Sequence, residues 1–345
     1  MTTAKPGKRL GFFTRLLDQV DAAERYRLAT AQIVHAESLG FDSAWVAQHH
    51  FHEDEGGLPG PFVFLAQVAA QTSRIRLGTA IVTLPLELPI RVAEDAAVLD
   101  LMCGGRLEVG VGPGGNLSAF AAFGLDSADR ATLLARHLEL LRDAWTGRPL
   151  PGGDRLYPGN PSLVDRVWQA TFTVDGARRA GAAGDGLLLS RAQPRPANAP
   201  DLSLADMQNP MIDAYLAALP DGREPRILAS RTVFVVDDWK DAQRFAEAGL
   251  GRMRARLAKS GRVPEDGSVA ELIAAFNVHL GTSDDVIVSL QADSAVARAT
   301  DLAVQVHSID PPHPFILRSI ELAAEVVAPA LGWVRDDATG IRRVA

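Results

Sequence analysis

The sequence predicts a single α/β domain of the (β/α)8 TIM barrel class with insertion loops, spanning residues 1–345. Short apolar stretches typical of strands alternate with helical stretches along the chain. The strands are nearly continuous apolar runs, as expected where helices cover the outside of a parallel sheet. Eight such strands can be identified, which is the number that a closed barrel needs. An open, doubly wound parallel sheet is the alternative arrangement.

Composition narrows the class of protein. Of the 345 residues, 47% are hydrophobic and 22% are charged, which is enough to bury a sizeable core. The net charge of -7 is spread along the sequence, so nucleic acid is not an expected partner. The single cysteine, Cys103, fits a reducing compartment. Because we find no secretory leader and no apolar run of transmembrane length, we expect a cytoplasmic protein without a membrane partner.

The first strand–helix–strand unit is clearly marked. An apolar run at 9–13 is followed by Asp21, which predicts a helix N-cap with Glu24 as its capping-box partner. Apolar residues then recur at helical spacing as far as Gly40, a residue that lets the chain turn out of a helix. The aromatic and branched residues at 41–50 predict the second strand.

The remaining elements follow the same alternation. Further strands are expected at 75–82, 106–112, 166–172, 185–190, 226–236 and 302–307. Helices are expected at 61–71, 90–102, 118–124, 130–141 and 318–332. Two segments rich in proline, glycine and asparagine, 149–163 and 191–210, are predicted to be long loops. The second follows a strand, so it either covers a site at the strand ends or is a plain surface excursion.

Histidines directly after the second strand are the most conspicuous chemical feature. His49, His50 and His52 precede three acids in QHHFHEDE, and His279 and His307 also lie near strand ends. Imidazoles and carboxylates bind metal ions, so a metal-dependent TIM-barrel hydrolase is one hypothesis. Neighbouring residues of a strand point in opposite directions, however, so His49 and His50 could hardly bind one ion together.

The competing hypothesis gives one of these histidines a role in proton transfer and assigns no metal site. Imidazole titrates near neutral pH and can both donate and accept a proton. A strand-end position in a barrel favours such a role over that of a solvated polar loop. The pattern alone does not choose between His49 and His50.

The segment GVGPGG at 110–115 satisfies GxGxxG after a strand. A dinucleotide fingerprint also requires the first βα turn of its unit and an acidic residue at the end of the next strand, whereas helical segments follow here. The glycines are therefore either places such as Gly112 where a cofactor approaches the backbone closely, or a tight turn.

Hydroxyl and guanidinium groups at three places suit a phosphate group. Thr171 and Thr173 end the fifth strand, and Ser190 and Arg191 end the sixth. Hydroxyls donate single hydrogen bonds, and an arginine matches a phosphate with its planar fork. Arg130 is a similar candidate, with the surface of a helix as its alternative location.

Three stretches, taken in order, closely resemble the luciferase-like flavin-dependent monooxygenases. They are GFDSAWVAQHHF at 40–51, the long segment at 74–112, and GWVRDD at 332–337. The motifs HHFHEDEGGLP, FGLDS and WQATF resemble a bacterial subgroup of FMN-dependent luciferase-like monooxygenases most closely. The resemblance covers nearly the whole chain and implies a barrel of the bacterial luciferase type.

The resemblance also implies an activity. Such enzymes bind reduced FMN across the barrel mouth, let it react with dioxygen to a flavin C4a-hydroperoxide, and transfer one oxygen to a small organic substrate. It further implies a separate flavin reductase as partner and a homodimer formed by helices of the N-terminal half. An F420-dependent oxidoreductase on the same barrel is the alternative, because relatives use that deazaflavin. A flavin-binding partner subunit without turnover is a further possibility.

The resemblance assigns roles to individual residues. His49 corresponds to the catalytic histidine of the family, and Ala80 and Ile81 correspond to a non-prolyl cis peptide under the flavin ring. The other positions that correspond to flavin or phosphate contacts are Arg130, Thr171, Ser190 and Arg191.

Two residues depart from the family pattern. Gln48 stands where a glutamate commonly precedes the histidine, which removes a charge that could raise the basicity of His49. Pro113 stands where many members have an arginine, so another arginine must replace that contact. We expect Phe12 and Phe13 to line the pocket, although an apolar lining suits many classes of organic substrate.

Overall fold

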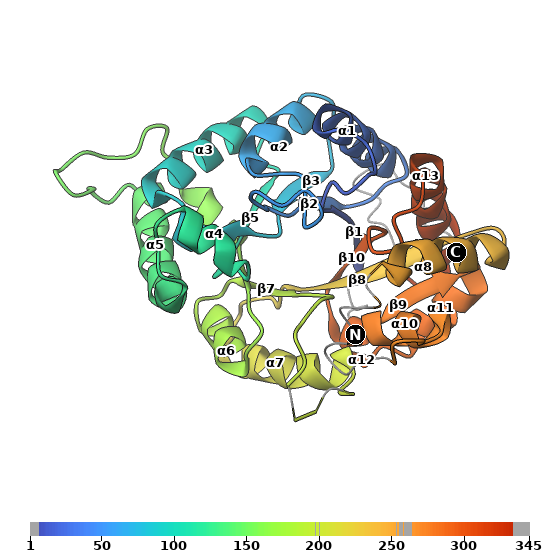
Figure 1. Cartoon of the computed structure of the whole chain (residues 1–345). Helices are drawn as coiled ribbons and strands as arrows, with labels where there is room; N and C mark the ends of the chain where they lie inside the picture. Colours follow the sequence, from blue (N-terminus) through green and yellow to red (C-terminus); the bar gives the residue numbers. More distant parts are fainter. Residues whose placement is uncertain are drawn as a thin grey trace, which may run out of the picture.

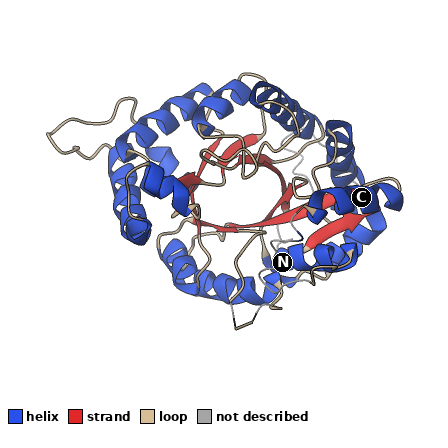
Figure 2. Cartoon of the chain, viewed as in Figure 1, coloured by secondary structure: helices blue, strands red, loops and turns tan. Residues whose placement is uncertain are grey.

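The computed structural model describes residues 7–196, 198–199, 201–252, 254, 258 and 264–333. The beginning of the chain, where we expected no secretory leader, and most of the GWVRDD motif lie outside the described residues. Within the described ranges the chain forms a closed ring of parallel strands surrounded by helices (Figure 1, Figure 2). The predicted (β/α)8 barrel is therefore confirmed, and the open sheet is not found.

The wall of the barrel contains eight strands, and each pairs with its neighbours in parallel. They are β1 (Arg9–Thr14), β2 (Ser43–Val46), β3 (Arg76–Thr79), β5 (Leu107–Gly112), β6 (Val167–Ala170), β7 (Gly186–Leu189), β8 (Ile227–Val235) and β10 (Asp301–Gln305). Pairing of β10 with both β1 and β8 closes the ring. A two-residue strand, β4 (Val82–Thr83), continues after β3 and pairs with β5.

Helices cover the outside of this ring (Figure 2). The longer helices are α1 (Ala22–Ser38), α2 (Pro61–Ala69), α3 (Pro89–Met102), α5 (Arg130–Trp145), α6 (Val174–Ala182), α7 (Leu204–Ala218), α8 (Trp239–Gly251), α10 (Val269–Phe276), α11 (Ser283–Gln291) and α13 (His313–Leu322). The shorter ones are α4 (Leu117–Ala122), α12 (Ser294–Arg298) and α14 (Ala328–Ala330), with 3-10 turns η1 (Leu84–Leu86), η2 (Ser127–Asp129) and η3 (Pro161–Arg166) and a π-helical turn η4 (Ala323–Val327). None of the helices in the described ranges combines the length and apolar character needed to cross a bilayer.

Alternating strand residues divide the core into an outer and an inner part. The inner cluster contains Phe13, Trp45, Ala47, Trp168, Leu188, Leu228 and Ala303. The two indole rings meet edge to face, with centroids 5.4 Å apart. A Cβ atom on Gly78 would lie 2.2 Å from Trp45, and one on Gly186 would lie 2.1 Å from Trp168. These two glycines therefore make the space in which the indoles close the barrel interior.

One predicted pocket residue faces away from this interior. Phe12 belongs to the large outer cluster between strands and helices, whereas Phe13 belongs to the inner cluster. The expectation that both line the pocket is wrong for Phe12, because consecutive strand residues point to opposite faces.

The strand β9 (Val278–Gly281) was not predicted, and it places His279 away from the barrel mouth. The first half of β8 pairs with β10, and its last residues pair with β9 instead. His279 therefore lies on a strand beside the wall, where its Nδ1 is 2.8 Å from the Ser289 hydroxyl of α11. It is not at a strand end of the barrel mouth, as the metal hypothesis required.

The long loop predicted at 191–210 is also partly wrong. Helix α7 begins at Leu204, where Ser203 and Asp206 form a capping box, and it contains Pro210. A good helix start outweighed the local density of proline and asparagine. In α1 the Asp21 side chain accepts from the Glu24 N–H as predicted, but the Glu24 carboxylate pairs with Arg27 instead of completing the box.

Candidate functional site

All the strands of the wall run in the same direction, so their carboxyl ends meet at one rim of the barrel. His49 follows β2, Thr171 follows β6, and Ser190 and Arg191 follow β7. The cis peptide between Ala80 and Ile81 follows β3. The topology therefore brings these predicted residues to the same rim, which we call the barrel mouth.

The peptide bond between Ala80 and Ile81 is cis, at the position where the resemblance implied such a bond. The Ala80 N–H donates to the Val46 carbonyl at 2.7 Å, which ties this segment to β2. Both residues pack on the inner apolar cluster. A Cβ on Gly112 would lie 2.5 Å from Ile81 Cδ1. Packing of Ile81 therefore accounts for Gly112, and no separate cofactor role is needed to explain this glycine.

His49 is held by its neighbours on two sides. The Arg15 guanidinium, just after β1, donates through Nε to His49 Nε2 at 3.3 Å. A Cβ on Gly56 would lie 2.2 Å from His49 Cδ2, so the loop backbone packs directly against the ring. Burial, the Arg15 charge and His50 together lower the pKa of His49 to about 4. The imidazole of His49 is therefore neutral at neutral pH.

His50 and His52 contact other groups. The His50 ring meets Phe123 edge to face at a centroid distance of 5.1 Å. His52 Nε2 lies 3.0 Å from the Ser118 hydroxyl of α4. In the described ranges no group of three or more histidine, cysteine, aspartate or glutamate side chains could hold a metal ion. The metal-hydrolase hypothesis therefore has no ligand set in this part of the chain.

Gln48, the first departure from the family pattern, is buried and fully engaged. Its amide donates to Glu87 at 2.6 Å and to the Pro59 carbonyl at 3.0 Å, and its oxygen accepts from the Thr83 N–H at 2.8 Å. A glutamate here could not donate to Glu87, so the amide suits this local network. Gln48 thus connects the loop after β2 to β4.

Arg191 is a buried cation held by neutral partners. Its Nε donates to Gln305 at 2.9 Å and its Nη1 to the Thr232 hydroxyl at 3.3 Å. No carboxylate of the described ranges forms an ion pair with it. Burial lowers the pKa of Arg191, and the charge of Arg15 lowers it further while Asp310 opposes the shift. Burying a guanidinium without a carboxylate costs stability, which is typical of a group kept for a ligand.

The loop after β7 is anchored by buried amides. Gln208 of α7 donates to the Ser190 carbonyl at 2.8 Å, and Gln208 is itself held by Arg231 at 2.9 Å. The Ser190 hydroxyl accepts from the Ala192 N–H at 3.1 Å. These contacts fix the backbone from which Ser190 and Arg191 project.

Thr171 and Thr173 lie together at the start of α6. The Thr173 hydroxyl accepts from the Gly176 N–H at 3.0 Å and caps the helix, and Thr171 accepts from the Thr173 N–H at 3.1 Å. The positive end of the helix dipole, the half-buried Thr171 and the exposed Thr173 make this place favourable for an anion.

Arg130 differs from the other candidates. Its Nη1 donates to the Ser127 carbonyl in the turn just before α5, at 2.9 Å. None of the hydrogen bonds of the described residues joins it to the other predicted site residues. The hydrogen bond to Ser127 therefore favours the alternative location of Arg130 on the surface of a helix.

Sequence reasoning missed Arg15 and Gln305. Both lie at carboxyl ends of strands, as His49 and Arg191 do. A glutamine inside the apolar strand LAVQVH was a visible signal, because an unpaired amide at a buried strand position is costly. Arg15 follows an apolar strand directly, and only its position could have indicated it.

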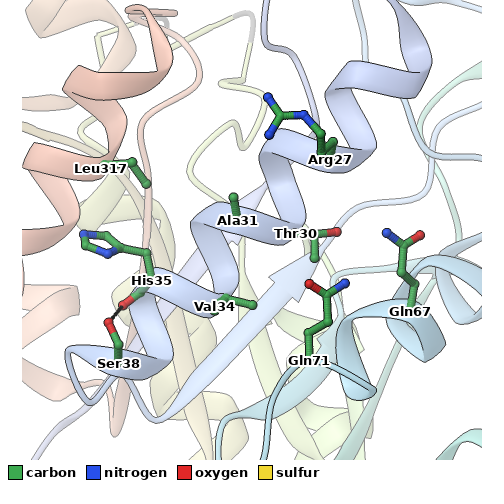
Figure 3. Close-up of a pocket in the computed structure, with 9 residues that line it drawn as sticks. All are labelled: Arg27, Thr30, Ala31, Val34, His35, Ser38, Gln67, Gln71 and Leu317. Carbon is green, nitrogen blue, oxygen red and sulfur yellow. Dashed lines mark hydrogen bonds between the residues drawn. The ribbon is translucent and has the colours of Figure 1, made fainter.

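One surface groove lies elsewhere. A groove of about 530 Å³ runs between α1, α2 and α13 on the outside of the ring, and Figure 3 shows its lining. It is lined by Arg27, Thr30, Ala31, Val34, His35, Ser38, Gln67, Gln71 and Leu317. None of the predicted site residues borders this groove. We place the candidate site at the mouth because the buried cation and the neutral histidine are found there.

Comparison with known proteins agrees with the fold and the motifs. A sequence model of luciferase-like monooxygenases matches residues 10–272. The 4-hydroxyprotoasukamycin monooxygenase of Streptomyces nodosus subsp. asukaensis is 28% identical over an alignment that covers 90% of this chain and 91% of that protein.

Solved structures share the fold. The oxygenating constituent of 3,6-diketocamphane monooxygenase from Pseudomonas putida, a complex with FMN, has a TM-score of 0.74 at 20% identity and covers 94% of this chain and 98% of its own. An F420-dependent secondary alcohol dehydrogenase with an F420–acetone adduct has a TM-score of 0.67 at 19% identity and covers 94% and 99%. The family match spans most of the chain and confirms the resemblance, so this protein belongs to the luciferase-like monooxygenase family.

Proposed function

We propose that this protein is a flavin-dependent monooxygenase that uses reduced FMN and dioxygen to oxygenate a small organic substrate. The observation that carries the proposal is the buried Arg191 guanidinium, whose hydrogen-bond partners among the described residues are all neutral, at the mouth of an apolar barrel interior. When bound, reduced FMN would supply the activation of dioxygen. The chain must then hold the cofactor, exclude water and manage a proton.

The residues at the mouth suit a flavin in charge and polarity. Ala80 and Ile81 form an apolar surface on top of the inner cluster, which suits one face of an aromatic ring system. Arg191 offers positive charge to an electron-rich part of the reduced cofactor. Thr171 and Ser190 offer hydroxyls to the phosphate, with Thr173 shaping the turn beside them.

His49 is the group that we assign to proton handling. Its imidazole is neutral over the physiological range because burial lowers its pKa. Its Nε2 accepts from Arg15, so the other ring nitrogen is the one available to hold a proton beside a reacting oxygen. His50 packs on Phe123 and is the weaker candidate.

The alternative is an F420-dependent oxidoreductase, which is favoured by the shared fold with an F420-dependent secondary alcohol dehydrogenase. Anaerobic titration of the full chain with reduced FMN and with reduced F420, followed by spectral change and thermal stability, separates the two. We expect tighter binding of reduced FMN. Tighter binding of F420, or no response to either cofactor, would contradict the proposal.

We also propose a reductase partner and a homodimer. The chain lacks the context of a nicotinamide fingerprint, so reduced flavin would come from a separate reductase in the cytoplasm, where the buried Cys103 stays reduced. Exposed apolar residues on α2 and α3, among them Val63 at 81% and Met102 at 67% exposure, suit a second copy. Light scattering of the wild type and of V63E tests this, with a monomeric wild type as the contradicting result.

A further inference from the structure

The contact between Arg15 and His49 joins the ends of two neighbouring strands. Arg15 directly follows β1, and His49 follows β2. Nε of Arg15 donates to Nε2 of His49 at 3.3 Å, while Nη2 of Arg15 donates to the Glu55 carbonyl. A guanidinium has only donors and stays protonated in proteins. His49 Nε2 must therefore be the acceptor and carry a lone pair.

This assignment leaves one place for the proton of the neutral ring. A neutral imidazole has a single N–H, so it resides on Nδ1. His49 Nδ1 makes no hydrogen bond to the described residues, and it is not among their buried unpartnered atoms. The Nδ1–H group is therefore accessible to a ligand. Gly56 packs on the opposite edge of the ring, next to Cδ2, and prevents the ring from moving in that direction.

We propose that Arg15 is a positioning residue that holds His49 in the neutral tautomer with the proton on Nδ1, so that His49 meets its ligand as a hydrogen-bond donor. The identity of that ligand rests on the proposed function, but the tautomer does not. Burial and the Arg15 charge lower the pKa of His49 to about 4, in agreement with a neutral ring.

The charged groups around the ring favour one class of ligand. Arg15, which follows β1, and His50, in the same loop as His49, both lower the pKa of His49. The nearby Glu55 carboxylate is directed to the Asn116 amide at 2.7 Å. The charge of Arg15 also lowers the pKa of Arg191. An N–H donor close to the Arg15 guanidinium suits an electron-rich or anionic oxygen and disfavours a cationic ligand.

The test is a long-range ¹H–¹⁵N correlation spectrum of the uniformly labelled full chain without cofactor at pH 7, with His49 assigned from H49Q. We expect a protonated Nδ1 and an unprotonated Nε2. In R15M, a second form protonated on Nε2 should appear, and the pKa of His49 should rise because a positive charge is lost. R15K, which keeps a donor and a charge, should retain the Nδ1–H form.

A matched control comes from a second arginine–histidine contact. Arg136 Nη2 lies 3.5 Å from His137 Nε2 on the exposed face of α5. R136M should alter the His137 signals and leave those of His49 unchanged. If wild-type His49 carries its proton on Nε2, the proposal is overturned even if R15M fails to fold. Unchanged His49 signals in a folded R15M would overturn it as well.

This experiment is separate from the proposed function. The spectra need no flavin, so a chain that fails to bind FMN could still show the Nδ1–H form. Conversely, a chain that binds FMN with the opposite tautomer would refute the role of Arg15 and leave the proposed activity standing. Turnover of R15M should fall at least tenfold with little change in flavin affinity, and R15K should recover part of it.

Discussion

The Thr79 hydroxyl donates to the Gly110 carbonyl at 2.8 Å and accepts from the Gly110 N–H at 2.9 Å. This double hydrogen bond joins β3 to β5 at the residue where the chain leaves β3 for Ala80. A Cβ on Gly110 would lie only 1.9 Å from the Thr79 carbonyl oxygen. The close approach of the two strands therefore needs both a hydroxyl and a glycine.

Replacing Thr79 with valine should destabilise the barrel. T79V keeps the shape but leaves a buried N–H and a buried carbonyl of Gly110 without their partner, which costs about 1–3 kcal/mol. Equilibrium unfolding in urea measures the loss. T79S retains the hydroxyl and should lose clearly less, and equal stability of T79V and wild type would show that the contact is dispensable.

Replacing Gly56 with alanine should displace His49. The added Cβ would lie 2.2 Å from the imidazole, so the ring must move. We expect G56A to lose at least tenfold in turnover while its affinity for reduced FMN changes little. G60A, in the same loop, is the control because its Cβ would meet only Val63 at 3.9 Å. Equal turnover of the two variants would refute the role assigned to the His49 position.

Replacing Arg191 with methionine should weaken the binding of reduced FMN without lowering the stability of the protein. The buried guanidinium has no carboxylate partner among the described residues, so R191M should be as stable as the wild type or more stable. Its affinity for reduced FMN should fall about tenfold to a hundredfold, because a hydrogen bond to a charged group contributes about 1.5–3 kcal/mol. Thermal melting and anaerobic titration give the two values.

Arg130 provides the comparison for this experiment. It lies at the start of a helix and donates to its own turn, so R130M should change flavin affinity much less than R191M. If R130M weakens binding more strongly, the phosphate-facing role that the resemblance implies for Arg130 is correct and our reading of the geometry is wrong.

The buried Asp185 should give stability an unusual pH dependence. Burial raises its pKa from 3.8 to about 6, although Arg142, which forms an ion pair with it, opposes the shift. The folded state therefore binds more protons than the unfolded state between about pH 4 and 6. This group alone makes the protein more stable as pH falls through that range.

The matched variant isolates that contribution. The free energy of unfolding of wild type relative to D185N should rise from pH 7 to pH 5. Other carboxylates, among them Asp100 and Asp293, have lowered pKa values and act in the opposite sense at lower pH, so only the difference between the two proteins is informative. A difference that is constant between pH 7 and 5 would contradict the raised pKa.

Much of this architecture follows from local sequence rules. Apolar strands and capped helices predicted the barrel because each unit buries one face regardless of its partners. The strand β9 escaped prediction because pairing with the end of β8 depends on where β10 stops. Helix α7 escaped because the prolines and asparagines around it are typical of a loop, whereas the cap at Ser203 that starts the helix is a local signal.

Some features of the candidate site were predicted from the sequence, and others were not. The cis peptide at Ala80 and the strand-end location of His49 and Arg191 were expected. The tautomer of His49 and the neutral partners of Arg191 were not, because they arise from Arg15 and Gln305, which are far away in sequence and meet these residues only when the barrel closes.

The most direct test of the central claim is a crystal structure of the chain grown anaerobically with reduced FMN. Our account predicts the flavin ring against Ala80 and Ile81, with the Arg191 guanidinium and the His49 Nδ1–H group directed at it. A flavin bound in the outer groove between α1 and α2, or crystals without flavin at saturating concentration, would contradict it.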